Sequence, residues 1–230
     1  MKTSSPLPAA LRFGISVRRV IGKIVPQGTR KQIHSLESQA RSLLGLPVPI
    51  RSNDRRVLEK VIFRYLSREN KSQVVLFVGC DFHTHHYPRL LSCAEFWTLE
   101  PDAAKAQWGA QKHIEDKLEN LHLHAKTLYF DVIICNGVFG WGLNDRESCE
   151  IAFNNCFNCL QPGGFLIVGW NDVPERRPFP LDELRALKRF SKWPFEPLHT
   201  WRYLTDTPNR HTFDFYQKTI PRHQVEQMTG

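Results

Sequence analysis

Two short apolar runs, separated by a connection long enough to hold a helix, constrain the fold of this chain more than any other feature. The first run covers residues 74–78 and ends at Gly79, and the second covers residues 96–99 and ends at Glu100. Short apolar runs with polar ends are typical of strands that are buried on both faces of a sheet. Two such strands joined by a helix form a βαβ unit, in which they lie parallel.

A glycine at the end of the first strand and an acid at the end of the second suit a nucleotide-like ligand. Gly79 lets the backbone approach the ligand, and Glu100, 21 residues later, can accept hydrogen bonds from ribose hydroxyls. The dinucleotide fingerprint needs three glycines, however, and this loop has only Gly79. The same two runs therefore also fit a buried βαβ unit with an ordinary turn glycine.

Helix and strand patterns alternate through the rest of the chain, as an α/β fold requires. Apolar spacing and capping signals predict helices at residues 55–68, 103–108, 145–160 and 181–190. Apolar runs predict further buried strands at residues 112–115, 130–135 and 165–169. The alternating, aromatic-rich runs 199–204 and 212–217 predict an antiparallel hairpin that closes the edge of the sheet.

A glycine-rich loop follows the clearest of these strands. The strand 130–135 runs into Asn136 and then into residues 137–142, of which three are glycine. This composition favours an irregular loop over a helix. A second stretch, Gln-Pro-Gly-Gly at residues 161–164, ends the preceding helix.

The net charge of +8 is concentrated in the first 36 residues. These residues include seven Lys and Arg and no acid, so the other 194 residues carry a net charge of only +1. Proteins that bind nucleic-acid phosphates spread basic surface over the fold, so the near-neutral body argues against a nucleic-acid partner. The apolar fraction of 41% supports a sizeable core. No run approaches the roughly eighteen apolar residues of a membrane span.

The sequence divides into a basic N-terminal arm with a short helix at residues 32–46 (together residues 1–52), one α/β domain (residues 53–220) and a polar tail (residues 221–230). Residues 11–24 mix apolar and basic side chains, which suits a helix lying on an anionic membrane surface. The arm also fits a segment that packs on its own domain, or an organellar transit peptide. We expect a cytoplasmic protein, peripheral to the inner face of the membrane if the arm binds there.

The six cysteines do not form a disulfide framework, because most of them fall in predicted buried strands and helices. Cys156 and Cys159 make a CxxC pair, but no second pair stands at the spacing of a zinc site, which favours a structural role. His83, His85 and His86 share one short loop, a spacing that rarely supplies a complete ligand set. The sequence therefore predicts no metal site and favours a reducing compartment.

The order of these patterns resembles the class I S-adenosylmethionine-dependent methyltransferases. Residues 75–80 look like the first strand and glycine of that family, and residues 130–133 look like its fourth strand. The Leu-x-Pro-Gly-Gly sequence at residues 160–164 is similar to the turn before its fifth strand. The resemblance covers residues 55–218. It implies an α/β, Rossmann-like methyltransferase fold, with a mostly parallel seven-stranded sheet, a terminal antiparallel hairpin and helices on both faces.

The resemblance also implies a site for S-adenosylmethionine at the ends of these strands. In the family, the residue at the position of Gly79 lies under the methionine part of the cofactor, and the acid at Glu100 holds the ribose diol. An acid such as Asp116 approaches the adenine amine, and the loop that begins at Asn136 borders the methyl group and the acceptor. The cofactor-binding residues implied in this way are Gly79, Cys80, Asp81, Glu100, Asp116, Asn136, Gly137 and Val138.

Three positions depart from the family pattern. Phe77 stands where the family often has an acid, and Asp81 and His83 replace later glycines of the first loop. Side chains cost more than glycine in unusual backbone geometry. The loop therefore either follows a variant path or forms a degenerate cofactor site.

The function that the resemblance implies is methyl transfer to a hydroxyl of a small molecule or carbohydrate, such as a glycan or lipo-oligosaccharide. The chain is similar in size and arrangement to sugar O-methyltransferases that decorate nodulation signals and surface glycans. A hydroxyl acceptor needs a base, and the candidates are Asp172 and His211, although the first also suits a local cap and the second a surface residue. Trp141 and Trp170 suit either an aromatic wall for a sugar or core packing.

Two other functions stay open at this point. A non-catalytic methyltransferase-like scaffold would explain Phe77 and the lost glycines. A nicotinamide-dependent oxidoreductase would explain the βαβ unit, but the single glycine and the terminal hairpin argue against it. A protein acceptor and any oligomeric state are equally compatible with the sequence.

Overall fold

The computed structural model describes residues 40–41, 52–68, 73–92 and 94–219. The predicted arm with its short helix, the tail and Cys93 lie outside the described residues, apart from residues 40, 41 and 52. The account of the fold that follows therefore concerns the α/β domain.

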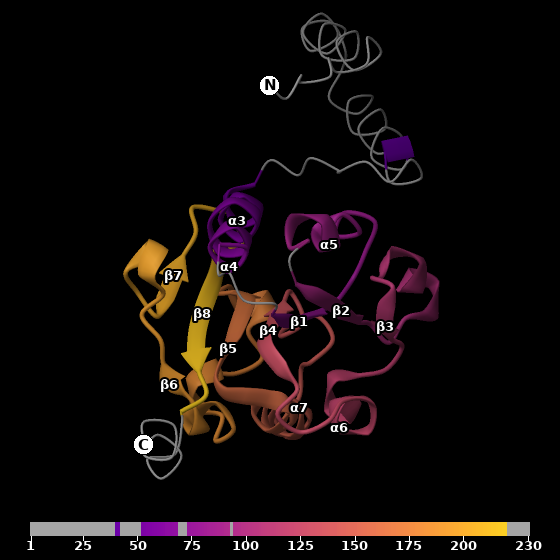
Figure 1. Ribbon diagram of the computed structural model, residues 1–230. Coiled ribbons are helices and arrows are strands. Elements are labelled where there is room, and N and C mark those ends of the chain that lie inside the picture. The colour runs from indigo at the N-terminus through magenta and orange to yellow at the C-terminus, as the bar shows by residue number, and fades with distance from the viewer. Residues whose placement is uncertain (1–39, 42–51, 69–72, 93, 220–230) are drawn as a thin grey trace, which may run out of the picture.

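Within the described residues, eight strands form one mixed sheet in the order β3-β2-β1-β4-β5-β8-β6, and β7 also pairs with β8 (Figure 1). The first five strands are parallel neighbours, and β8 runs antiparallel to β5. This arrangement confirms the Rossmann-like fold with a terminal antiparallel hairpin. The count exceeds the seven strands expected because β6 and β7 share the outer side of β8. The strands are β1 (Val74–Val78), β2 (Glu95–Leu99), β3 (Lys112–Ile114), β4 (Phe130–Asn136), β5 (Leu160–Asn171), β6 (Ser191–Lys192), β7 (Arg202–Leu204) and β8 (His211–Gln217).

Helices cover both faces of the sheet (Figure 1). On one face lie a continuous helical segment and α5, and on the other lie α6 and α7. The helical segment consists of α3 (Asn53–Val57), a π-helical turn (Leu58–Ile62) and α4 (Phe63–Leu66). The others are α5 (Tyr87–Leu90), α6 (Leu121–His124) and α7 (Arg146–Cys159). Short 3-10 helices cover Ala103–Trp108, Leu118–Asn120, Pro174–Arg176, Leu181–Glu183, Leu187–Arg189 and Glu196–Leu198.

The side chains of β1 alternate between the two faces of the sheet, as the pleat of a strand requires. Val75 and Phe77 pack under α3 and α4, whereas Leu76 and Val78 pack against the α7 side. All four side chains are buried. Phe77, which stands where the resemblance leads one to expect an acid, is therefore a core residue, and its ring contacts Phe63 and Tyr87 edge-on.

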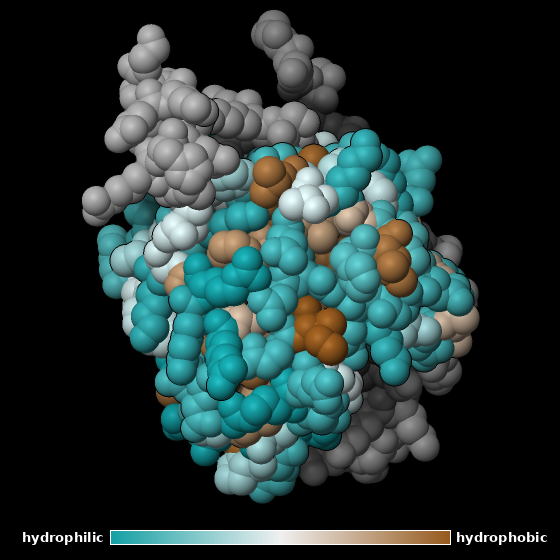
Figure 2. Space-filling model, turned by 90° about the horizontal axis from the view of Figure 1, so that it is seen from below, coloured by the Kyte–Doolittle hydropathy of each residue, from teal (hydrophilic) through white to brown (hydrophobic). Residues whose placement is uncertain are grey.

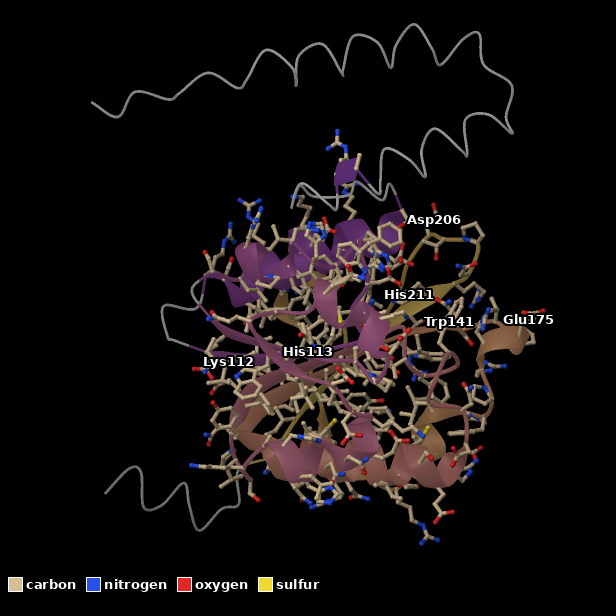
Figure 3. The ribbon with its side chains drawn as sticks, turned by 90° about the vertical axis from the view of Figure 1, so that its right-hand side faces the viewer. Lys112, His113, Trp141, Glu175, Asp206 and His211 are labelled. Atoms are coloured by element: carbon tan, nitrogen blue, oxygen red, sulfur yellow. The ribbon has the colours of Figure 1, made fainter. Side chains whose placement is uncertain are left out.

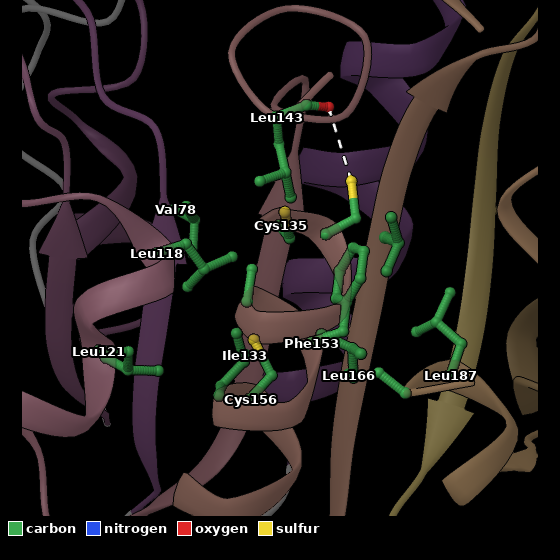
Figure 4. Close-up of a cluster of buried hydrophobic side chains, with 14 of the residues drawn as sticks. Val78, Leu118, Leu121, Ile133, Cys135, Leu143, Phe153, Cys156, Leu166 and Leu187 are labelled. Carbon is green, nitrogen blue, oxygen red and sulfur yellow. Dashed lines mark hydrogen bonds between the residues drawn. The ribbon is translucent and has the colours of Figure 1, made fainter. Parts of the chain in front are cut away.

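Helix α7 begins at a side-chain cap and packs its thiols inward. The Asp145 side chain accepts a hydrogen bond from Ser148 N at 2.8 Å. Cys149, Cys156 and Cys159 lie on the buried face of α7, and Figure 4 shows Cys156 near Ile133 in this core. The five described cysteines are free thiols, and burial raises the pKa of those three. These cysteines fill the core, as the sequence predicts.

The predicted helix at residues 181–190 is wrong. The segment forms two separate 3-10 turns, and Leu184 between them is extended, with φ −62° and ψ 127°. The carboxylate of Glu150 on α7 accepts hydrogen bonds from Arg185 N and Ala186 N, both at 2.7 Å. These tertiary hydrogen bonds satisfy backbone donors that a continuous helix would have bonded internally.

The predicted strand at residues 165–169 is longer than expected. β5 begins at Leu160, directly after α7, and its pairing with β4 shifts register between Phe130 and Val132. Gly163 has a φ of +78°, which the irregular part of the strand requires. The Gln-Pro-Gly-Gly stretch therefore ends the helix, as predicted, but continues as an irregular start of the strand.

The face of the molecule that carries α6 and α7 is mainly hydrophilic, with separate hydrophobic spots (Figure 2). Leu123 on α6 and Ile151 on α7 are exposed. Single exposed apolar side chains are normal on a soluble surface. None of the helices in the described part of the chain has the length and apolar character needed to cross a bilayer.

Candidate active site

The carboxyl ends of the parallel strands and the amino end of β8 meet at one edge of the sheet. This edge brings together the residues that follow β1, β2 and β4 with the last residue of β5, and β8 begins there because it runs antiparallel. Figure 3 shows His211, the first residue of β8, beneath the N-terminal end of α3, with Trp141 on the same side of the molecule. In parallel α/β sheets, this edge is where ligands bind.

Gly79 and Glu100 lie side by side at this edge. Gly79 has a φ of +85°, and its N–H donates to Leu99 O at 2.8 Å. Glu100 is 9% exposed, and its carboxylate accepts from Cys80 N at 3.3 Å and from Asp102 N at 3.1 Å. The sequence-predicted neighbours Gly79, Cys80 and Glu100 are thus brought together, and the carboxylate joins the loops that follow β1 and β2.

The loop after β1 follows a variant path that its own side chains hold. Thr84 Oγ1 accepts from Asp81 N at 2.9 Å and donates to Asp81 O at 3.0 Å. Asp81 also accepts from Phe82 N at 2.6 Å. Among the described residues, only Leu128, His199 and Arg210 combine a side chain with positive φ, so neither Asp81 nor His83 is strained.

The three histidines of this loop have different hydrogen-bond and charge partners, although the rings of His85 and His86 contact each other edge-on. His85 Nδ1 lies 2.6 Å from Phe82 O, and His86 is buried with its Nε2 3.6 Å from Glu59 Oε1. Burial, followed by the charge of Arg55, lowers the pKa of His83 to about 4. No group of three or more His, Cys, Asp or Glu side chains in the described part of the chain is arranged to hold a metal ion.

Asp116, expected near an adenine amine, is bound within its own turn. Its carboxylate accepts from Lys117 N at 2.7 Å, from Asn120 Nδ2 at 2.8 Å and from His124 Nε2 at 2.7 Å. These hydrogen bonds, that of His124 first, lower the pKa of Asp116 to about 2. In the structure, these hydrogen bonds hold the Asp116 carboxylate within the turn beyond β3.

Asn136, predicted at the end of the fourth strand, contacts His211, the predicted base candidate. His211 Nε2 lies 3.1 Å from Asn136 Oδ1, and His211 Nδ1 lies 2.7 Å from Asn171 Oδ1. His211 is 6% exposed and Asn171 is 7% exposed. Burial, which outweighs the charge of Asp54, lowers the pKa of His211 to about 4. Two sequence-predicted residues 75 positions apart thus meet in one half-buried contact.

The loop after β4 keeps its glycines for two different reasons. Gly137 has a φ of +72°, and a Cβ there would meet nothing within 4 Å, so it opens onto free space. Gly140 has a φ of +82°, and a Cβ there would lie 1.9 Å from Arg176 O. The carbonyl of Val138 accepts from the N–H groups of the three residues 141–143 and so holds the turn.

Asp172, the other predicted base, is paired with two arginines. Its Oδ1 accepts from Arg177 Nη1 at 2.7 Å, and its Oδ2 lies 3.6 Å from Arg210 Nη2. The backbone N–H of Asp172 also donates to Arg210 O at 3.1 Å. The carboxylate therefore fixes the loop after β5 against the start of β8.

The two tryptophans expected at the mouth separate into a surface residue and a core residue. Trp141 is 52% exposed, and the guanidinium of Arg176 lies 3.4 Å from the centre of its ring. Trp170 is buried, packs against Phe139 and donates to Asp214 Oδ2 at 3.1 Å. Of these two tryptophans, only Trp141 is accessible to a molecule at the edge of the sheet.

Sequence reasoning missed three residues of this edge. Asn171 contacts His211, Gly169 faces both Asn136 and His211, and the charge of Arg55 on α3 acts on His83 and His211. The strand-end position of Asn171 was the available signal, because Asn136 ends the neighbouring strand in the same way. The sequence gives no sign that α3 crosses this edge.

No protein-family model and no curated protein matches the sequence. Solved structures with the same fold do exist. The N-methyltransferase NodS of Bradyrhizobium japonicum, in complex with S-adenosylhomocysteine, has a TM-score of 0.55 at 14% identity, over 73% of this chain and 89% of that chain. A SAM-dependent methyltransferase of Methanosarcina mazei has a TM-score of 0.54 at 11% identity, over 70% and 98%. A TehB-like SAM-dependent methyltransferase of Corynebacterium glutamicum has a TM-score of 0.53 at 13% identity, over 84% and 100%. The chain therefore has the Rossmann-like fold of class I methyltransferases.

Proposed function

We propose that this protein is an S-adenosylmethionine-dependent methyltransferase that acts on a small-molecule acceptor. Its fold supports this function, because the solved structures that share it include methyltransferases, one of them in complex with S-adenosylhomocysteine. The observation that carries the proposal is the meeting of Gly79 and the buried carboxylate of Glu100 at the ends of adjacent parallel strands.

These residues suit the cofactor chemically. Each carboxylate oxygen of Glu100 has one backbone partner, and an ionised carboxylate offers about four lone-pair sites, so it can also accept from ribose hydroxyls. The absence of a side chain on Gly79 leaves the backbone open, because the nearest atom that a Cβ would meet is Val138 Cγ2 at 3.6 Å. When bound, the cofactor supplies an activated methyl group, and this chain orients it against the acceptor.

The acceptor that we propose is a small molecule such as a carbohydrate, reacting through a hydroxyl or an amine. The sugar hydroxyl is the expectation from sequence, and exposed Trp141 at the same edge supports a sugar ring as one ligand. An amine is the second candidate. It is favoured because Asp172 is paired with two arginines, and because NodS, which shares the fold, is an N-methyltransferase.

The unstrained loop after β1 supports a binding site over a degenerate one. Asp81 and Thr84 hold the loop through hydrogen bonds, and no positive φ is needed at Asp81 or His83. The non-catalytic scaffold therefore loses its main argument. The terminal hairpin of β7 and β8 continues to argue against a nicotinamide-dependent oxidoreductase.

Thermal denaturation with S-adenosylmethionine, S-adenosylhomocysteine and NAD separates the three candidate functions. A ligand that binds only the native state stabilises it by about 2.7 kcal/mol at a hundredfold excess over Kd. We expect the two S-adenosyl ligands to raise the melting temperature at millimolar concentration and NAD to leave it unchanged. A shift with NAD alone would favour the oxidoreductase, and no shift with any ligand would favour the scaffold.

A further inference from the structure

Three polar side chains from three neighbouring strands form a cluster beside the open loop after β4, in which His211 and Asn171 are buried and Asn136 is half-buried. Asn136 ends β4, Asn171 ends β5 and His211 begins β8. His211 lies between the two amides, at 3.1 Å from Asn136 and 2.7 Å from Asn171. The cluster thus links the candidate site, through Asn136, to the antiparallel edge of the sheet.

The imidazole of His211 lies between the two amides and holds the Asn136 carboxamide. Burial keeps it neutral at pH 7, and a neutral imidazole donates through one nitrogen and accepts through the other. Nε2 faces the oxygen of Asn136 and Nδ1 faces the oxygen of Asn171. The ring therefore donates to Asn136 Oδ1 in the tautomer that carries its proton on Nε2. In that tautomer, the oxygen of Asn136 retains one free lone pair, because an amide oxygen has two.

Gly169 makes room for this arrangement. A Cβ at residue 169 would lie 2.0 Å from Asn136 Oδ1 and 2.9 Å from His211 Nε2. Gly169 lies directly beside Asn136 in the pairing of β4 with β5. Only a residue without a side chain leaves space for the Asn136 carboxamide between the strand and the imidazole.

Both side chains that the sequence suggested as bases, Asp172 and His211, already have polar partners. Asp172 is paired with Arg177 and Arg210, and both ring nitrogens of His211 face amides. A hydroxyl acceptor must lose its proton as it attacks, which needs a base within hydrogen-bond reach. A neutral amine attacks through its lone pair and needs no base at that step.

We infer that His211 is a positioning residue that holds the Asn136 carboxamide so that its oxygen accepts a hydrogen bond from the N–H of an amine, the methyl acceptor. This inference rests on the proposed methyltransferase function and narrows its acceptor to a nitrogen nucleophile. In the transfer step, the nitrogen–carbon bond forms while the carbon–sulfur bond breaks. The bonding electrons go to sulfur, which becomes the thioether of S-adenosylhomocysteine. The methylated ammonium then releases one proton to water.

The Asn136 oxygen would assist that step without acting as a base. As the amine attacks, positive charge develops on its nitrogen, and a hydrogen bond from N–H to an amide oxygen strengthens. The same hydrogen bond directs the amine lone pair away from Asn136. Gly137, which opens onto free space, leaves room for the amine beside the carboxamide.

Two substitutions of His211 separate positioning from simple packing. In His211→Gln, the side-chain amide reaches the place of Nε2 and keeps the contact with Asn136. In His211→Asn, the shorter amide reaches the place of Nδ1 and keeps the contact with Asn171 only. Gly169→Ala is a third variant, which displaces the Asn136 carboxamide without removing a polar group.

Sinefungin is a probe that does not require the natural acceptor, because it carries an amine in place of the sulfonium methyl group. Calorimetry gives its Kd and that of S-adenosylhomocysteine, which lacks this amine, for each variant. We expect the wild-type protein to prefer sinefungin, and Asn136→Ala, His211→Asn and Gly169→Ala to reduce that preference about tenfold, the scale of a hydrogen bond to a charged group. His211→Gln is expected to keep most of it.

Three results would overturn the inference while the protein still binds S-adenosylhomocysteine. They are no wild-type preference for sinefungin, an unchanged preference in Asn136→Ala, and equal preferences in His211→Gln and His211→Asn. A wild-type protein that binds neither ligand would instead overturn the proposed function, and the inference with it. Melting temperatures measured on the same preparations identify variants that fail to fold.

Discussion

The loops after β1 and after β4 border the same edge of the sheet but are built in opposite ways. The loop after β1 has side chains where related loops have glycine, and Asp81 and Thr84 hold its path through hydrogen bonds. The loop after β4 keeps its glycines, and Gly137 and Gly140 both adopt positive φ. Side-chain hydrogen bonds hold the path of the first loop, whereas the path of the second loop depends on backbone conformations that glycine adopts readily.

This difference shows where a glycine is indispensable in this fold. Asp81 and His83 need no left-handed backbone, so their side chains are tolerated. Gly140 needs both a left-handed backbone and close contact with the carbonyl of Arg176, which no side chain permits. Replacing a glycine therefore signals a degenerate site only where the geometry requires that glycine.

The largest expected effect comes from Gly140→Ala. A Cβ there would lie 1.9 Å from Arg176 O, on a backbone with φ +82°. We expect the free energy of unfolding to fall by about 3 kcal/mol, since backbone strain and a clash with main-chain atoms add. Gly142→Ala is the matched control, because a Cβ at residue 142 would meet nothing within 4 Å. If urea unfolding shows equal losses of unfolding free energy for the two variants, the geometry does not require glycine at residue 140 more than at residue 142.

A smaller effect is expected in the loop after β1. Thr84→Val keeps the shape of a buried side chain but removes both hydrogen bonds to Asp81. We expect a loss of about 2 kcal/mol in unfolding free energy, because Asp81 N loses its partner and Asp81 O keeps only the hydrogen bond from Thr84 N. The exposed Thr127 provides a control, as Thr127→Val should change stability by less than about 0.5 kcal/mol. If Thr84→Val loses no more unfolding free energy than the control, interactions other than the hydrogen bonds of the Thr84 hydroxyl hold the loop.

The pH dependence of stability tests the burial of His211 at the meeting point of the two regions. Its pKa is about 4 in the folded protein against 6.5 when unperturbed, so the unfolded chain binds the proton more readily. Stability is then fully present above pH 6.5 and is lost as pH falls toward 4. Between pH 7 and pH 5 this group accounts for about 1–2 kcal/mol.

The variant His211→Gln removes that contribution, so its unfolding free energy should depend less on pH than that of the wild-type protein. The charge of Asp54 opposes the shift in the pKa of His211, and the charge of Arg55 reinforces it. Parallel pH profiles for the two proteins between pH 7 and pH 5 would mean that His211 is accessible to protons in the folded state.

Much of the fold follows from the sequence, because buried strands and their connections leave local patterns. The apolar runs of β1 and β2, with the glycine after the first, predict the central βαβ unit. The helix at residues 181–190 fails because Glu150, more than thirty residues away, takes its backbone N–H groups. Tertiary hydrogen bonds of this kind leave no local signal.

The candidate site is predictable to a similar degree. Gly79 and Glu100 meet as expected, because both end neighbouring parallel strands. Asp172 also lies at the predicted edge, but its pairing with Arg177 and Arg210 depends on how two loops pack. The contact of Asn136 with His211 joins strands 75 residues apart in sequence, so only the topology reveals it.

Substitutions in the basic N-terminal arm are expected to have the smallest effect on the folded domain. We propose that this arm contacts anionic membranes. Arg18, Arg19 and Lys23 contribute charge to that arm, and their joint replacement by Gln should leave S-adenosylhomocysteine affinity unchanged. Binding to anionic vesicles should weaken, and salt should weaken it in the wild-type protein, since exposed charges are screened within about 10 Å at 0.1 M.

Replacing three exposed lysines of the domain provides the control for vesicle binding. The residues are Lys60, Lys117 and Lys126. If both triple variants lose vesicle binding equally, the charge of the whole protein matters and the arm has no special part. If neither loses it, membrane contact through electrostatics is excluded for this arm.

Calorimetric titration of S-adenosylhomocysteine into Glu100→Ala, with Glu115→Ala as control, tests the central claim most directly. Glu100 is buried between the two loops, whereas Glu115 is exposed just beyond β3. We expect Glu100→Ala to weaken binding by about 1–3 kcal/mol, the cost of losing hydrogen bonds to a charged group, and Glu115→Ala to leave the Kd unchanged. Equal Kd values for the wild-type protein and folded Glu100→Ala would contradict a cofactor site at the ends of β1 and β2.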